Sequence, residues 1–225
     1  MSIVRTALWI AAKDLRVELR SREIVPTMTL FGVLVAVLCS LALFVDENTG
    51  RQVAPAVLWI AIAFAGTLGL SRTWSREREE GALKAILLAP VDPAALYLGK
   101  SLGALAFVLI TECVVAPLVG LLLHAPVLEH LGPFVLLVLL GTIGFVAAGT
   151  LFGAMTARTR ARDLMLAVVL YPLVAPALLC GTVATRELFN GQSLVDLRDW
   201  FVLLLAFDTI FIVGGSALLG LLLTD

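Results

Sequence analysis

Two acidic residues, Glu112 and Asp208, lie inside long apolar stretches of this sequence and are the side chains best placed to do chemistry there. A charged carboxylate at the centre of a bilayer costs about 2.5 kcal/mol or more unless it is paired or hydrated. Ionisable residues in such places are therefore candidates for a functional role, for example in a proton-coupled carrier. The other interpretation is a neutral carboxylic acid that joins two helices by a hydrogen bond, and the sequence leaves both open.

The tripeptide Gly99-Lys100-Ser101 resembles the end of a phosphate-binding loop but lacks the rest of that motif. The motif requires an earlier glycine so that the backbone can curl around phosphate, and Ala94 occupies that position. No strand is predicted before it. Lys100 is therefore interpreted as a basic residue at the mouth of an apolar helix, and we do not expect this chain to bind ATP through the tripeptide.

Signatures of other catalytic and metal sites are absent from the sequence. It contains no HExxH or GxSxG motif and no paired Cys/His spacing. His124 and His130 share a short segment after an apolar stretch, where we interpret them as ordinary loop residues rather than as ligands of a haem iron. We therefore predict a non-catalytic protein with no catalytic or metal-binding residues and no directly bound cofactor.

Composition indicates that a membrane must position these residues. Hydrophobic residues make up 60% and charged residues 15% of the chain, and the mean hydropathy is +1.04. Soluble domains average about 45–50% apolar and about 25% charged residues. An apolar helix of about 17–25 residues crosses the bilayer. We therefore predict one all-α, polytopic membrane domain over residues 1–225, with six transmembrane helices near 24–45, 53–70, 102–123, 133–155, 164–184 and 201–223.

The distribution of Lys and Arg predicts the orientation of these helices. Thirteen of the 16 basic residues fall in three segments, 1–23, 71–101 and 156–163. The alternate segments hold the other three, Arg51, Arg186 and Arg198. Because cytoplasmic loops are enriched in Lys and Arg, we expect both termini and the three basic segments to lie in the cytoplasm.

Three features flank or interrupt the predicted spans. Apolar residues recur at helical spacing within 1–23, which predicts an interfacial helix along the cytoplasmic leaflet, in contact with the lipid bilayer. Pro172 and Pro176 remove backbone donors from the fifth span and make it a candidate hinge. Residues 185–200 are expected to form a short helical cap on the outer, periplasmic face.

The small residues of the fourth span predict close helix packing, either within the subunit or against a second copy of the chain.

The segment 71–101 is the most informative part of the sequence. An acidic and basic cluster, RERE at 76–79 followed by Glu80, precedes Gly81 and a Leu-rich run that is too short to span a membrane. Such a run either folds back onto the bilayer or is covered by a soluble partner. A short amphipathic helix that enters a partner's groove would transmit force between subunits.

Residues 77–100, with the acidic cluster, Gly, Leu-rich turn, Pro-x-x-Pro and Gly-Lys, resemble the cytoplasmic loop of ABC-2 type transporter permeases. Nearly the whole chain resembles the CcmB family, the haem exporter B proteins. One departure lies in the fifth span, which reads YPLVAPALLCG where a more Leu/Ile-rich run is expected. The matching stretches are KDLRVELRSRE (13–23), LWIAIAFAGTLGLSRTWSREREEGALKAILLAPVDPAALYLGK (58–100), GTIGFVAAGTLFGAMTARTRARD (141–163) and YPLVAPALL (171–179).

This resemblance implies a permease subunit in the bacterial cell inner membrane that works with a separate ATP-binding cassette subunit. The ATPase activity, and with it the ATP, would belong to that partner. A haem-handling membrane protein and a small membrane peptide would complete the complex, which makes haem available to a periplasmic haem chaperone for c-type cytochrome biogenesis. Haem would be the substrate of the complex. ATP hydrolysis would drive either haem export or chaperone release, and the lack of an intramembrane His favours release. No nucleic-acid partner is expected.

The resemblance also implies roles for particular segments. Residues 77–90 would form the coupling helix on the ATPase, and 13–23 the elbow helix. The coupling contacts would come from Glu77, Glu79, Glu80, Gly81 and Leu87. Two alternatives remain: a proton-coupled secondary carrier that uses Glu112 or Asp208, and an ABC-2 exporter of another lipid or drug substrate.

Overall fold

The computed structural model describes residues 2–43, 46–79, 91–156 and 162–224. Within these ranges the chain is almost entirely helical and contains no strand, as expected for apolar segments that must satisfy their backbone hydrogen bonds without water. The helices are α1 (Ile3–Ser21), α2 (Ile24–Leu43), α3 (Glu47–Glu79), α5 (Pro93–Leu122), α6 (Leu131–Thr156), α7 (Arg162–Phe189) and α8 (Arg198–Thr224).

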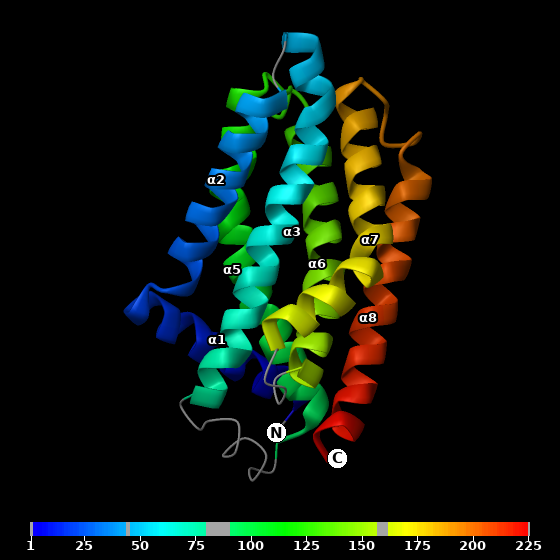
Figure 1. Cartoon of the computed structure of the whole chain (residues 1–225). Helices are drawn as coiled ribbons and strands as arrows, with labels where there is room; N and C mark the ends of the chain where they lie inside the picture. The colour runs from blue at the N-terminus through cyan, green and yellow to red at the C-terminus, as the bar shows by residue number, and fades with distance from the viewer. Residues whose placement is uncertain (1, 44–45, 80–90, 157–161, 225) are drawn as a thin grey trace.

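Six of the described helices form a bundle, and both ends of the chain lie at one end of it (Figure 1). These six, α2, α3, α5, α6, α7 and α8, are each long and apolar enough to cross a membrane. Helix α1 lies across the bundle at the end that holds the termini, which we call the terminal end; the opposite end is the far end. The prediction of an all-α polytopic membrane protein with six spanning helices is confirmed.

Helices α3 and α6 form the centre of the bundle. In their apolar windows 67% and 72% of the residues are buried, against 28%, 28% and 22% in α2, α7 and α8. The peripheral helices therefore direct most of their apolar side chains outward. That is the expected arrangement for a bundle in lipid, which is as apolar as the protein interior and does not drive these side chains inward.

Small residues of α6 allow α3 to pack closely against it. A Cβ atom added at Gly153 would lie 2.6 Å from Cδ1 of Trp74, and one added at Gly149 would overlap Leu70. On another side of α6, a Cβ at Gly144 would lie 2.6 Å from Cδ1 of Phe207 on α8. The glycine-rich face predicted for this span is thus used within the subunit.

Trp59 of α3 is the largest side chain in the buried centre, with 2% of its surface exposed. Its ring lies against Gly141 of α6 and Gly181 of α7, and a Cβ at Gly181 would be 2.5 Å from Cζ2 of the ring. The indole Nε1 donates a hydrogen bond of 3.0 Å to Oγ1 of Thr185. One side chain therefore joins the two central helices to α7.

Helix α7 contains both predicted hinge prolines, Pro172 and Pro176. Figure 1 shows that its first part, in yellow, lies at an angle to the rest of the helix. Each proline removes a backbone donor and crowds the preceding turn, which favours a bend. The bend is a property of this conformation, and movement about it stays a prediction.

The connections next to α1 and α8 are defined by local hydrogen bonds. Arg22 ends α1 in the left-handed conformation (φ 53°) and its N–H donates to the Glu18 carbonyl. The Glu18 side chain accepts a hydrogen bond of 2.9 Å from the N–H of Val25, at the start of α2.

In the range 185–200, α7 continues to Phe189, turns follow, and α8 begins at Arg198. The expected cap therefore has no separate helix of its own in this range.

Candidate functional site

The segment expected to couple this chain to a partner begins at the last turn of α3. Glu77 and Glu79 lie in that turn, and α3 ends at Glu79. Glu80, Gly81 and Leu87 lie outside the described residues. Helix α5 begins at Pro93, after Asp92, whose side chain accepts a hydrogen bond of 2.8 Å from the N–H of Ala94. The two helices that flank the segment end and begin at the terminal end of the bundle (Figure 1).

Glu112, the first intramembrane acid, lies on α5 and is 4% exposed. Its Oε1 accepts a hydrogen bond of 2.5 Å from the hydroxyl of Thr142 on α6. Its Oε2 is buried and has no hydrogen-bond partner among the described residues. The neighbouring Thr111 hydroxyl lies 3.3 Å from that of Thr29 on α2. A short polar layer therefore joins α2, α5 and α6 inside the bundle.

Asp208, the second intramembrane acid, lies on α8 and is also 4% exposed. Its carboxylate packs against α6 at Gly144, where any side chain would overlap Oδ1. That oxygen is buried and has no hydrogen-bond partner within the described part of the chain. Gly144 follows Thr142 by two residues, or about 200° around a helix. The two acids therefore contact different faces of α6, and the structure does not bring them together.

Substitution of Glu112 is expected to separate its hydrogen-bonding role from any role of its charge. Glu112→Gln keeps an acceptor for Thr142, so the free energy of unfolding should change by less than about 1 kcal/mol. Glu112→Ala removes that contact and leaves a space, and should cost about 1–2 kcal/mol. Pulse proteolysis in mixed detergent and SDS micelles measures both values. Equal losses in the two variants would contradict the hydrogen-bonding role.

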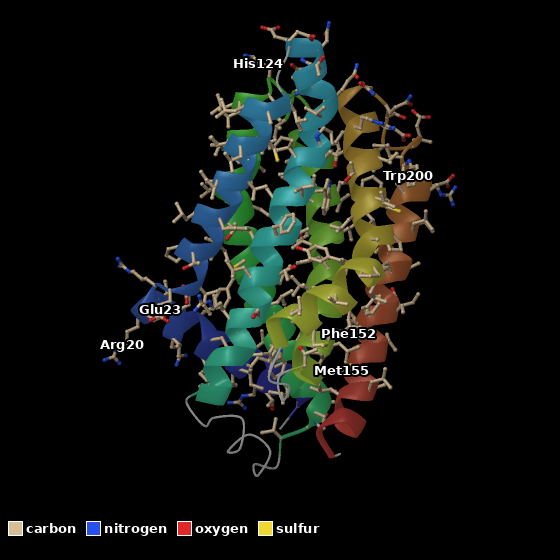
Figure 2. The ribbon with its side chains drawn as sticks, viewed as in Figure 1. Arg20, Glu23, His124, Phe152, Met155 and Trp200 are labelled. Atoms are coloured by element: carbon tan, nitrogen blue, oxygen red, sulfur yellow. The ribbon has the colours of Figure 1, made fainter. Side chains whose placement is uncertain are left out.

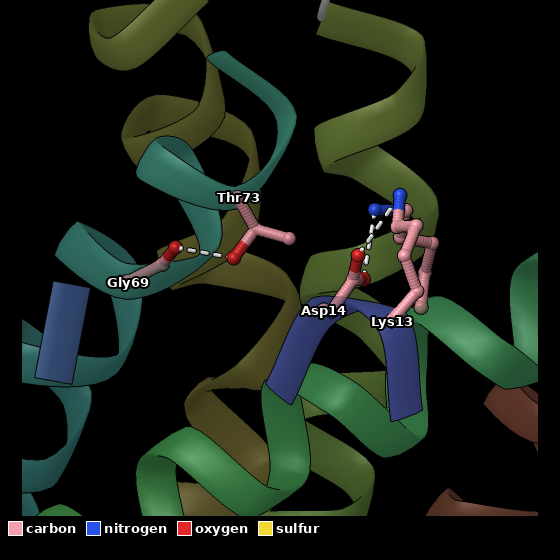
Figure 3. Close-up of polar contacts among 5 residues, drawn as sticks. Lys13, Asp14, Gly69 and Thr73 are labelled. Atoms are coloured by element: carbon pink, nitrogen blue, oxygen red, sulfur yellow. Dashed lines mark hydrogen bonds and ion pairs between the residues drawn. The ribbon is translucent and has the colours of Figure 1, made fainter. Parts of the chain in front are cut away.

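Lys100, from the incomplete phosphate-loop motif, is buried in an ion pair. Its side chain is 1% exposed, and its Nζ lies 2.8 Å from Oδ2 of Asp14 on α1. The ammonium is also 5.9 Å from the ring centre of Trp74 on α3. Figure 3 shows the Asp14 carboxylate with its two contacts, one of them to the exposed Lys13 at 3.1 Å, beside the turn of α3 that carries Thr73.

This pairing was not predicted from the sequence, which placed Lys100 only at a helix mouth. A helix of mixed apolar and basic residues does not show which acid will face a cation 86 positions further along the chain. The one available signal was Gly99-x-x-x-Gly103, a small-residue spacing typical of close helix contact in membranes. A Cβ at Gly99 would lie 2.8 Å from the carbonyl oxygen of Ala7, so these glycines bring α1 against α5.

The far end of the bundle carries the histidines and a second set of polar contacts. Figure 2 shows His124 and Trp200 at this end, and Arg20 and Glu23 near α1 toward the other. Arg51 Nε donates to the His124 carbonyl at 3.1 Å, and Trp200 Nε1 donates to Glu187 at 2.8 Å. Among the residues that the structure describes, no three His, Cys, Asp or Glu side chains are grouped as a metal site.

The turn before α8 at the far end is closed by Asp196 and Ser193. The Asp196 carboxylate accepts hydrogen bonds from the Ser193 hydroxyl at 2.6 Å and from its N–H at 3.1 Å. These bonds stabilise the charged form and lower the pKa of Asp196 below its usual value. The group stays ionised and structural at neutral pH, and it offers no proton for transfer.

Comparison with known proteins places most of the chain in one group. The CcmB protein family model matches residues 5–217. Heme exporter protein B of Paracoccus denitrificans (strain Pd 1222) is 30% identical over 182 residues, which cover 78% of this chain and 80% of the relative. The protein of the same name from Bradyrhizobium diazoefficiens is 27% identical, with 80% of each chain covered. That from Pseudomonas aeruginosa is 27% identical, with 76% of each chain covered.

Proposed function

The chain belongs to the CcmB family, and we propose that it is the membrane permease subunit of an ABC transporter complex that handles haem. One observation carries this proposal: the family match extends from residue 5 to residue 217, across five of the candidate spans and most of the sixth. In this proposal a separate subunit binds and hydrolyses ATP. The complex makes haem available to a periplasmic haem chaperone, together with a haem-handling membrane protein and a small membrane peptide.

The terminal end of the bundle would face the cytoplasm of the bacterial inner membrane. The excess of Lys and Arg at this end supports that orientation. Helix α1 would lie in the inner leaflet as the elbow helix, because Leu8, Trp9 and Leu19 are exposed beside the exposed Arg16 and Arg20. The segment after Glu79 would then be in reach of a soluble ATP-hydrolysing subunit.

The ATP-driven step would be mechanical. The two intramembrane carboxyls, those of Glu112 and Asp208, contact different faces of α6. Neither carboxyl belongs to a group of three or more His, Cys, Asp or Glu side chains within the described residues. We therefore favour use of ATP hydrolysis to release a loaded chaperone over passage of haem through this subunit.

The proposal is tested by purifying the tagged chain in mild detergent and identifying its partners. We expect an ATP-binding subunit and a haem-handling membrane protein to co-purify with the unmodified chain. Glu80→Lys and Leu87→Asp should each reduce recovery of the ATP-binding subunit by about tenfold or more, because a reversed charge or a buried carboxylate opposes docking. Recovery is measured by quantitative mass spectrometry and by ATP hydrolysis.

Matched controls come from the far end of the bundle. Glu129→Lys and Leu128→Asp make the same substitutions at exposed positions, Leu128 being 85% exposed. These variants should keep the ATP-binding subunit. If the unmodified chain purifies without an ATP-hydrolysing partner, the proposal is wrong. Co-purification of an ATPase without a haem-handling protein would instead indicate an ABC-2 exporter of another lipid or drug.

A proton-coupled carrier is the second candidate function, favoured by one specific observation. Glu112 and Asp208 each keep one buried carboxylate oxygen without a hydrogen-bond partner among the described residues. A carrier would transport without an ATPase and would stop when either acid is neutralised. Glu112→Gln and Asp208→Asn therefore discriminate: activity that survives both substitutions excludes the carrier.

A further inference from the structure

Helices α3 and α5 flank residues 80–92. The buried Lys100 ammonium of α5 joins them by a contact with α3. Lys100 lies eight residues into α5, and Trp74 lies near the end of α3. The Lys100 ammonium is 5.9 Å from the Trp74 ring centre, close enough for a cation–π attraction. The same ammonium pairs with Asp14 of α1 at 2.8 Å. Helices α1, α3 and α5 therefore meet at the Lys100 ammonium, and two of them, α3 and α5, flank residues 80–92.

Burial makes this contact difficult to break. Lys100 is 1% exposed and Asp14 is 10% exposed, so neither charge is freely hydrated. If α1 moved away from α5 while Lys100 stayed in place, the buried ammonium would lose its 2.8 Å contact with the Asp14 carboxylate, which is unfavourable. Any displacement of the start of α5 is therefore expected to move α1 as well.

The packing around the ion pair also resists sliding. A Cβ atom at Gly99 would be 2.7 Å from Cβ of Ile10, and one at Gly103 would be 3.4 Å from Cβ of Asp14. At Gly99 the two helices thus approach more closely than any side chain would allow, whereas at Gly103 an added Cβ would make an ordinary contact. Packed contacts of this kind transmit displacement because they are not continuously deformable.

We propose that the Asp14–Lys100 ion pair is a positioning contact that makes α1 move together with the ends of α3 and α5. The inference rests on the proposed function, since an ATP-hydrolysing subunit at residues 80–90 would supply the displacement. Helix α1 is then a moving part of the transport cycle, and Lys100 is the residue through which ATP hydrolysis reaches it.

The movement can be measured in the purified complex by fluorescence energy transfer between α1 and α8. Dyes are attached as maleimides to Trp9→Cys and Val213→Cys, both at exposed positions, in a background in which Cys39, Cys113 and Cys180 are replaced by Ser. We expect ATP to change the transfer efficiency in the otherwise unmodified complex. Lys100→Met should remove most of that change, because the ion pair between α1 and α5 is lost. Recovery of the ATP-hydrolysing subunit should not change.

A covalent link distinguishes positioning from a general loss of structure. The Cβ separation of 3.4 Å between Gly103 and Asp14 is close to that of a disulfide. Asp14→Cys with Gly103→Cys, added to Lys100→Met and oxidised before labelling, should restore the ATP-dependent change, and reductant should remove it again. Lys13→Met is the matched control, because Lys13 also contacts Asp14 but is 48% exposed, and it should behave as the unmodified complex.

The outcomes separate the two proposals. If the ATP-hydrolysing subunit is absent from the unmodified preparation, the proposed function fails and this inference fails with it. If the subunit is present but ATP does not change the α1–α8 transfer efficiency, the inference is overturned and the function stands. A response to ATP that is unchanged in Lys100→Met, or a disulfide that does not restore it, also overturns the inference.

Discussion

Replacement of Trp59 by alanine is expected to lower the free energy of unfolding by about 2–4 kcal/mol. The ring is 2% exposed and fills the space between the backbones of α6 and α7 at Gly141 and Gly181. Its removal leaves a cavity bordered by glycines, which have no side chains to fill it. The expected loss in the free energy of unfolding lies toward the lower end of the range for soluble cores. Lipid is as apolar as the protein interior, so the variant loses packing contacts but not the free energy of transfer from water.

Two further variants show whether the packing or the hydrogen bond dominates at this site. Trp59→Phe keeps an aromatic ring at this position but loses the 3.0 Å hydrogen bond to Thr185. Its loss in the free energy of unfolding should be about half that of Trp59→Ala. Trp9→Ala removes the same residue type from an α1 position that is 56% exposed, and should change stability little. Pulse proteolysis in mixed SDS micelles measures all three. A Trp59→Ala variant as stable as Trp9→Ala would disprove the central packing role.

Asp14→Ala is expected to destabilise the protein by about 3–5 kcal/mol, because it removes a carboxylate that lies 2.8 Å from the buried Lys100 ammonium. Lys100 is 1% exposed and cannot reach water without displacing its neighbours. Lys100→Met should cost less than Asp14→Ala, because the carboxylate left behind is 10% exposed and also contacts the exposed Lys13. The order of the two single variants is thus part of the prediction.

The double variant provides the decisive comparison for the ion pair. Asp14→Ala with Lys100→Met removes both charges, so it should be more stable than Asp14→Ala alone. The measurement is the same proteolysis experiment on the four members of the cycle. If the effects of the two single variants simply add, the two charges do not interact and the pair has no role in stability.

The six spans could be predicted from sequence because their signal is one of composition. An apolar run of sufficient length must be helical in lipid, whatever its neighbours. The boundaries were less accurate: α3 runs from Glu47 to Glu79, well beyond the predicted 53–70. A helix can continue into polar flanks, since its backbone hydrogen bonds do not depend on the bilayer.

The contacts between helices could not be predicted in the same way. Both intramembrane acids were identified, but their partners Thr142 and Gly144 follow from how α5 and α8 rotate against α6. The Asp14–Lys100 pair depends on how α1 folds back over α5. The Gly99-x-x-x-Gly103 spacing indicates a close helix contact at this place but does not identify the partner helix. Apolar length determines which segments span, whereas side-chain complementarity at a few positions determines how they pack.

The short connections at the far end affect how the chain enters its membrane. Only residues 44–46 separate α2 from α3, while 123–130 separate α5 from α6 and 190–197 separate α7 from α8. Each pair can insert as a helical hairpin, in which two apolar segments carry one brief polar link across the lipid. With the terminal end in the cytoplasm, as proposed above, only a few charged side chains per hairpin would be desolvated during insertion. The thirteen basic residues of the other segments would not have to cross the membrane.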